Sequence, residues 1–127
     1  MRWRSASASK KQQAFLRGLH AESMVGVYMM LRGCKILARR YKTPVGEIDL
    51  IARRGKTILF VEVKARANKA QALEAVHVQA QGRIIRAAQY FISQHPRYNS
   101  YAMRFDVAAF CPPFRVHYLD NAWQGHT

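Results

Sequence analysis

The chain has 127 residues, 50% of them hydrophobic, and its 21 Lys and Arg against 7 Asp and Glu give a formal net charge of +14. This length suits one compact domain that folds without disulfides or a structural metal, and this charge favours a polyanionic partner, nucleic acid first. The longest apolar run, 24–31, is too short to span a bilayer, so we expect no membrane partner.

The N-terminal segment 1–11 is rich in Arg, Lys and Ser and contains no acid. We therefore expect a basic flexible arm there, followed by a single domain over 12–127. Cys34 and Cys111 stand alone, without the close spacing of a zinc site or the density of a disulfide framework. Such cysteine usage is typical of a reducing compartment, which predicts a cytoplasmic protein.

The first predicted element is a helix over 12–31, because apolar residues recur there at helical spacing and Gly33 stands where the helix would end. Strand patterns follow, and a second helical pattern interrupts them. The predicted strands are 35–41, 47–53, 57–65, 104–111 and 115–119, with the second helix at 71–94. The order αβββαββ, with a helical crossover between the third and fourth strands, predicts an α/β domain in which helices pack on a mixed sheet.

Three of the seven acids, Glu47, Asp49 and Glu62, fall in two strands that should be neighbours. A two-residue turn at 54–55 would place Glu47 opposite Glu62 and Glu62 diagonal to Asp49. In this register one face is apolar and comprises Ile48, Leu50, Ala52, Leu59, Val61 and Val63. The other face comprises Glu47, Asp49, Glu62 and Lys64. A three- or five-residue turn would send the carboxylates to opposite faces instead.

Carboxylates gathered on a partly buried face either raise their pKa values or hold a cation. Oxygen ligands without nearby Cys or His favour Mg²⁺ or Mn²⁺ over zinc. Lys64 would lie on the same side, and a divalent ion beside a lysine in so basic a protein suits hydrolysis of a phosphodiester. A plainer interpretation remains open, in which these residues form a solvated strand face and the pair of Glu62 and Lys64 is an ordinary surface pair.

Several motifs in this chain resemble those of a known family. They are Gly18-x-x-x-Glu22, Gly46-Glu47-Ile48-Asp49-Leu50-Ile51, Phe60-Val61-Glu62-Val63-Lys64-x-Arg66 and Arg104-Phe105-Asp106-Val107. Together they resemble the YraN-like protein family over about 18–107. That family is similar to the restriction-endonuclease-like superfamily, which includes Holliday-junction resolvases and carries an Asp followed by (Asp/Glu)-x-Lys on adjoining strands. The resemblance implies a three-layer α/β/α nuclease fold.

The resemblance also implies roles for individual residues. Asp49 and Glu62 would be metal ligands, Lys64 the catalytic lysine and Glu22 the helix-borne acid, with Glu47 as an additional ligand candidate in the same motif. From its position alone, Glu22 is more typical of a glutamate on a helix surface. Relatives usually carry a basic residue near Ala80, so one substrate contact of the family is absent here.

Basic residues elsewhere are candidates for phosphate contacts that position the chain without reading base sequence. Arg66, close behind Lys64, is the one expected nearest the scissile bond. The others are Arg53, Arg54, Lys56, Arg83 and Arg86. Asp106 is expected to be a structural acid that pairs with a neighbouring Arg.

Taken together, these features predict a Mg²⁺-dependent (or Mn²⁺-dependent) endonuclease that prefers DNA to RNA and acts on branched or otherwise structured DNA. A homodimer is expected by analogy with junction enzymes. The alternative hypothesis is a nucleic-acid-binding module that keeps the nuclease fold and the acidic face without turnover. A weaker option is a basic protein whose charge serves RNA or the ribosome. Competition between RNA and DNA at fixed salt distinguishes that last option.

Overall fold

The computed structural model describes residues 4–7, 21–111 and 115–124. In chain order the elements are β1 (Arg4–Ser7), α2 (Ala21–Leu31), β2 (Lys35–Thr43), β3 (Gly46–Arg54), β4 (Thr57–Ala65), α3 (Lys69–Glu74), α4 (Val78–Gln94), η1 (Pro96–Tyr98), β5 (Ala102–Cys111) and β6 (Arg115–Trp123). No helix in these ranges is both long and apolar enough to cross a membrane.

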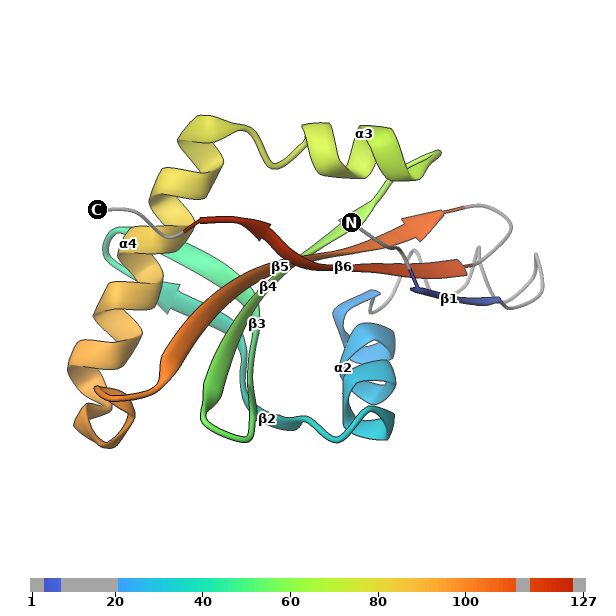
Figure 1. Cartoon of the computed structure of the whole chain (residues 1–127). Helices are drawn as coiled ribbons and strands as arrows, with labels where there is room; N and C mark the ends of the chain where they lie inside the picture. Colours follow the sequence, from blue (N-terminus) through green and yellow to red (C-terminus); the bar gives the residue numbers. More distant parts are fainter. Residues whose placement is uncertain (1–3, 8–20, 112–114, 125–127) are drawn as a thin grey trace.

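The strands form one six-stranded sheet in the order β1-β6-β5-β4-β3-β2 (Figure 1). The pair β4–β5 is parallel and is joined through α3 and α4, whereas the other neighbours are antiparallel. The sheet is therefore mixed, with the helical crossover in the place that the sequence predicts.

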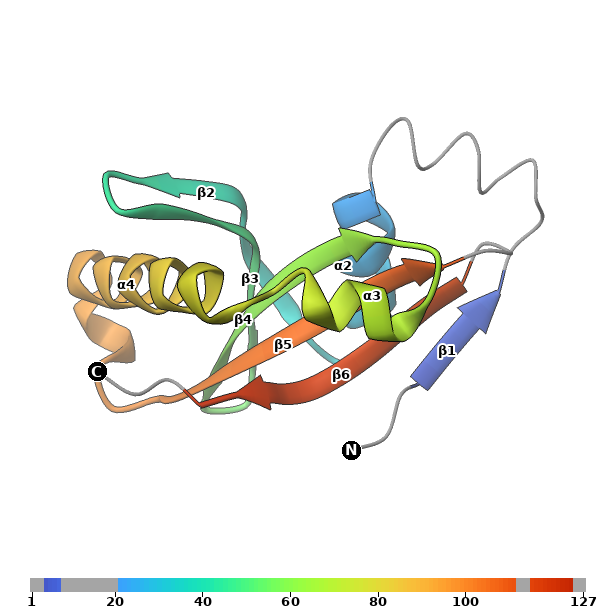
Figure 2. The ribbon, with the colours of Figure 1, turned by 90° about the horizontal axis from the view of Figure 1, so that it is seen from above.

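Helices cover both faces of the sheet, as Figures 1 and 2 show. Side chains of α4 pack with one core cluster of the sheet, which includes Ile51, Ile58, Phe60, Ile84 and Phe91. Side chains of α2 pack with a second cluster, which includes Val25, Met29, Leu50, Leu59 and Val61. The buried residues of β3 and β4 thus divide between two cores, and the expected three-layer α/β/α architecture is confirmed.

The structure differs from the predicted elements in two places. The predicted second helix is interrupted, because His77 has an extended backbone and its ring accepts a hydrogen bond from the amide of Ala80, which begins α4 anew. Four residues of the predicted basic arm, Arg4–Ser7, form a strand paired with β6 instead of a loose segment. The predicted first helix is seen as α2, and its first part, 12–20, lies outside the described residues.

The turn between β3 and β4 also differs from the prediction. Arg54 pairs with Thr57, so the two central residues are Gly55 and Lys56 and not 54–55. Gly55 has φ +59° and stands first in the turn, where two-residue hairpin turns of type II′ carry glycine. The pairing is shifted by two residues, and a shift of two keeps side chains on the same face.

One residue of the predicted apolar face is misplaced. Ile48 packs in the cluster of α4 and not with Leu50 and Val61 in the cluster of α2. The ladder between β3 and β4 ends at the pair of Leu50 and Val61, and beyond it Ile48 pairs with Tyr41 of β2, which packs against the same α4 cluster.

Candidate metal and nuclease site

Asp49 lies on β3 at the point where β3 and β4 part. The last ladder pair there is Leu50 with Val61, and one residue further the Asp49 carboxylate accepts a hydrogen bond from the backbone N–H of Val63 at 2.8 Å. The side chain thus takes the place of a strand carbonyl. Extending the observed register by one pair brings Asp49 level with Glu62, whereas the predicted register had placed Glu47 there.

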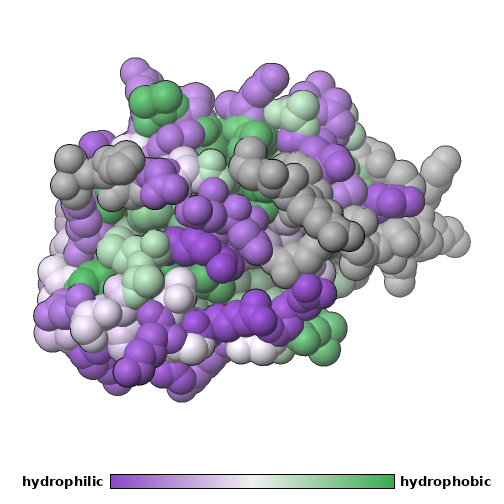
Figure 3. All heavy atoms as spheres, in the orientation of Figure 1, coloured by the Kyte–Doolittle hydropathy of each residue, from purple (hydrophilic) through white to green (hydrophobic). Residues whose placement is uncertain are grey.

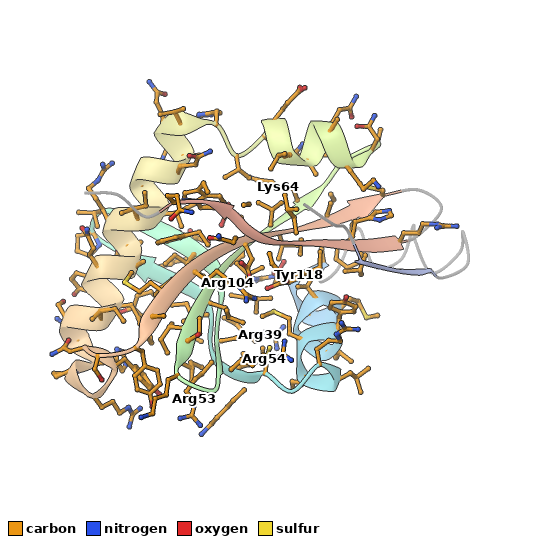
Figure 4. All side chains as sticks on the ribbon, in the orientation of Figure 1. Arg39, Arg53, Arg54, Lys64, Arg104 and Tyr118 are labelled. Atoms are coloured by element: carbon orange, nitrogen blue, oxygen red, sulfur yellow. The ribbon has the colours of Figure 1, made fainter. Side chains whose placement is uncertain are left out.

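Glu62 and Lys64 come from β4, whose backbone pairs with β5 at both positions. The Lys64 Nζ lies 3.7 Å from Glu62 Oε2, and the two side chains are 25% and 12% exposed. The other carboxylate oxygen, Glu62 Oε1, is buried and has no hydrogen-bond partner among the described residues. Figure 4 shows Lys64 near the end of β4 that lies beside α3. The site therefore holds the carboxylates of Asp49 and Glu62 and the ammonium of Lys64, and one oxygen of Glu62 is a free acceptor.

Burial shifts both carboxyl groups toward the neutral form. Burial, followed by the charge of Asp49, raises the pKa of Glu62 to about 8, although Lys64 acts to lower it. Burial also raises the pKa of Asp49, against the effects of the Val63 hydrogen bond and of Lys64. In the absence of a cation the pair therefore resists carrying two negative charges at neutral pH.

Glu22 comes from the first turn of α2, and its charge contributes to the raised pKa of Asp49, so the helix-borne acid lies near the pair. Its carboxylate accepts a hydrogen bond from Arg40 Nε at 2.5 Å. Sequence reasoning did not assign this role to Arg40, which sits on β2 with an unusual φ of +49°. A basic residue in a strand carries no sequence signal that would have shown it as the partner of a helix acid.

Glu47 is exposed on β3 and pairs across the ladder with Lys42. Within 4–7, 21–111 and 115–124, no three His, Cys, Asp or Glu side chains gather where one ion could sit. The acids brought together are therefore Asp49 and Glu62, with Glu22 nearby but held by Arg40. Two carboxylates fit Mg²⁺, which commonly uses one or two together with waters and substrate phosphates, and the bare Glu62 oxygen is free to serve as a ligand.

The predicted phosphate-contact residues are spread over the molecule. Arg66 directly follows β4, two residues after Lys64, and is exposed, with its guanidinium donating to the Ala65 carbonyl at 2.9 Å. Arg53, Arg54 and Lys56 lie at the opposite end of the hairpin, and Arg83 and Arg86 are exposed on α4. On the face drawn in Figure 3, hydrophilic side chains predominate outside the grey atoms.

Asp106 is a structural acid paired with arginine, as predicted. It is fully buried on β5 and accepts hydrogen bonds from Arg104 Nε at 2.9 Å, the Tyr118 hydroxyl at 2.6 Å and the Asn121 amide at 2.8 Å. Figure 4 shows Arg104 and Tyr118 together in the middle of the sheet, away from Lys64. Asp106 therefore belongs to the fold and not to the acid pair.

Comparison with known protein sequences shows the family of this chain. The profile of the uncharacterised protein family UPF0102 matches residues 21–110, which contain the acid pair, Lys64 and Glu22. The chain belongs to this family. A UPF0102 protein of Mesorhizobium japonicum is 42% identical over 118 residues, which cover 93% of this chain and 94% of the relative. A UPF0102 protein of Bradyrhizobium diazoefficiens is 45% identical over 106 residues, 84% of this chain and 80% of the relative. The family resemblance predicted from the motifs is thus confirmed over most of the chain.

Proposed function

We propose that this UPF0102 protein is a metal-dependent endonuclease that hydrolyses phosphodiester bonds in DNA, with branched or otherwise structured DNA as its preferred substrate. The observation that carries the proposal is the pair of Asp49 and Glu62 where β3 and β4 part, with a buried free oxygen on Glu62 and the Lys64 ammonium 3.7 Å from its other oxygen. Burying two carboxyl groups side by side, one of them with an oxygen that no described residue hydrogen-bonds, is costly, so this arrangement favours a functional site.

Each side chain has a role in this proposal. Asp49 and Glu62 hold Mg²⁺ or Mn²⁺, which when bound polarises the scissile phosphate and acidifies a water. Lys64 orients the attacking water or stabilises the negative charge that develops on the phosphate oxygens. Asp49 is positioned by the hydrogen bond that it accepts from the Val63 amide. Glu22 of α2, hydrogen-bonded to Arg40, lies beside this pair of acids.

The choice of DNA rests on charge and on resemblance. A formal net charge of +14 concentrates polyanions around the protein whatever their sequence. The motifs on β3 and β4 resemble those of Holliday-junction resolvases, and no base-reading module is evident in the sequence. Recognition by shape and backbone is therefore the mode that we propose.

The test is cleavage of linear, flapped and four-way DNA by the full chain with Mg²⁺ or Mn²⁺, compared with Lys64→Ala and Asp49→Asn. We expect Lys64→Ala to lower the cleavage rate by about a hundredfold or more while DNA affinity changes by less than about threefold, because the ammonium acts on the reaction and not on docking. Asp49→Asn should not cleave with either metal, because it removes a proposed metal ligand. Lys42→Ala, which removes an exposed lysine of β2, is the matched control and should cleave normally.

Two outcomes would overturn the proposal. If wild-type protein binds every DNA but cuts none of them with either metal, the chain is a binding module with a nuclease fold. If RNA outcompetes DNA at fixed salt and no DNA is cut, the charge serves RNA instead.

A further inference from the structure

A polar cavity lies away from the acid pair, where the start of β2 and the end of β3 meet η1 and the loop after it. Its volume is about 400 Å³, and its lining comprises Lys35, Ile36, Leu37, Arg53, Arg97, Tyr98 and Tyr101. A volume of this size falls in the range of roughly 300–1,000 Å³ that small-molecule sites occupy. The cavity is thus large enough for a ligand with a ring and a charged group.

The lining is cationic and aromatic. Lys35, Arg53 and Arg97 contribute positive charge, and none of the described residues that line the cavity is an Asp or Glu. The salt bridges of the described chain pair other cations with the carboxylates, so these three cations have no acidic partner there. Clustered cations without carboxylates repel one another, and an anion relieves that repulsion.

Two tyrosines contact two of the three cations. The Arg53 guanidinium donates to the Tyr101 hydroxyl at 3.4 Å, and the Arg97 guanidinium lies 5.0 Å from the centre of the Tyr98 ring. The Tyr98 and Tyr101 rings meet edge to face at 5.0 Å, and Tyr98 is buried whereas Tyr101 is only half-buried. Tyr101 therefore offers aromatic surface beside the cations, and Tyr98 supports it from behind.

The cavity is separate from the acid pair. Arg53 lies four residues along β3 from Asp49, which in strand geometry is about 13 Å. Figure 4 shows Arg53 and Lys64 at opposite ends of the hairpin formed by β3 and β4. A group bound in the cavity would therefore not be the phosphate that faces Asp49 and Glu62.

We propose that this cavity binds a nucleotide, with the phosphate held by Lys35, Arg53 and Arg97 and the base packed against Tyr101. Arginine recognises phosphate through paired N–H donors, and bases stack on aromatic side chains. The nucleotide comes either from an unpaired end of the DNA or from the free pool. The first source rests on the proposed function and gives the endonuclease a second contact with its substrate.

The experiment measures binding to the full chain by calorimetry in EDTA, so that it needs neither metal nor cleavage. The probes are thymidine monophosphate, inorganic phosphate and thymidine. We expect the monophosphate to bind at least about tenfold more tightly than either part, because it uses both the cations and Tyr101. Arg97→Ala and Arg53→Ala should each weaken it by about tenfold or more, since a hydrogen bond to a charged group is lost. Arg115→Ala, an exposed arginine on β6, should change it by less than about twofold.

DNA with a single-stranded tail, compared with a blunt duplex, distinguishes the two sources. If the tail binds more tightly and Arg97→Ala removes that preference, the nucleotide is a DNA end, and if only the monophosphate responds, it is the free nucleotide. The proposal is overturned if the monophosphate fails to bind, or if Arg115→Ala weakens binding as much as Arg97→Ala does. Either failure leaves cleavage at Asp49 and Glu62 untouched, whereas loss of cleavage with intact monophosphate binding would overturn the proposed function alone.

Discussion

Glu62 places a carboxylate in the protein interior with one oxygen lacking a hydrogen-bond donor among the described residues. Its neighbour Asp49 is satisfied by the Val63 amide, so the two acids differ although they sit side by side. An unpaired buried acceptor costs about 1–3 kcal/mol, and more when it is charged. The site is therefore a local weakness of the fold that a bound cation would relieve.

The raised pKa of Glu62 predicts how stability depends on pH. Because the folded pKa is about 8, above its ordinary value, folded protein keeps a proton that the unfolded chain has already lost. The free energy of unfolding should therefore fall between about pH 4.5 and 8, on the order of 2–4 kcal/mol. Glu62→Gln, always neutral, should lose most of this decline and be more stable than wild type at pH 8 in EDTA, as urea unfolding at pH 5 and 8 would show.

The control for this prediction is Glu47→Gln, which removes an exposed carboxylate from the same hairpin and should leave the pH dependence unchanged. Added Mn²⁺ at pH 8 should stabilise wild type but not Glu62→Gln, because a ligand that binds only the folded state raises stability. A wild-type slope retained in full by Glu62→Gln would contradict the assignment.

Asp106 gives a second prediction at this scale. Its carboxylate is fully buried and gathers donors from Arg104, Tyr118 and Asn121. Asp106→Ala should lower the free energy of unfolding by about 3–5 kcal/mol, because it leaves those donors without their acceptor. Asp120→Ala removes a 44% exposed carboxylate 3.8 Å from the same arginine and should cost less than about 1 kcal/mol. Chemical denaturation measures both, and equal losses would show that burial of Asp106 is not what matters.

At the scale of elements, the tip of the hairpin formed by β2 and β3 presses on α4. A Cβ on Gly46 would lie 2.8 Å from the Arg83 carbonyl oxygen, which is a backbone atom and cannot rotate away as a side chain could. This contact accounts for a glycine directly before the acidic strand. It also ties the position of β3, and hence of Asp49, to the first half of α4.

Two glycine substitutions should therefore have opposite effects. Gly46→Ala should destabilise the protein by about 1–3 kcal/mol, because the hairpin must move off α4. Gly82→Ala, inside α4, should stabilise it by about 0.5–1 kcal/mol, since its Cβ would meet only the end of the Arg86 side chain at 3.4 Å and alanine favours helix. Thermal unfolding of both variants tests the pair. A loss at Gly82 as large as that at Gly46 would mean that close packing of the hairpin is not the cause.

Element boundaries show which parts of the fold local patterns could predict. The two strands of the hairpin follow from alternation and are as predicted, but Ile48 packs on the face opposite to the one that alternation assigns to it. The turn between them differs from the prediction. The position of Gly55 within the turn decides which residues pair, and turns at 54–55 and at 55–56 were both compatible with the same apolar face. The break at His77 was also missed, since apolar spacing continues through 71–94 and an imidazole that caps a helix leaves no periodic signal.

At the scale of the whole molecule, a formal net charge of +14 on 127 residues dominates any encounter with nucleic acid. The predicted basic residues lie at the turn between β3 and β4, directly after the end of β4 and along α4. They do not form one patch around Lys64. Such a distribution positions a large polyanion through many weak contacts and carries no base specificity.

This distribution predicts a steep dependence of DNA binding on salt. If about four to eight phosphates are contacted, affinity should fall by at least about a hundredfold between 50 and 200 mM salt, because each contact releases a counterion. Arg66→Ala should lower the slope of log affinity against log salt by about 1. Filter binding in EDTA over a salt series measures both quantities. An affinity that hardly changes with salt would exclude phosphate contacts as the main source of binding.

By itself the sequence determined the family, the strands β2 to β6 and the place of the helical crossover between β4 and β5, because motifs and side-chain alternation are local properties of the chain. Only the tertiary structure decided that Asp49 and not Glu47 stands level with Glu62, that Arg40 holds Glu22, and that Lys35, Arg53 and Arg97 line one cavity. These outcomes depend on the turn and on contacts between segments far apart in the chain, which no local pattern records.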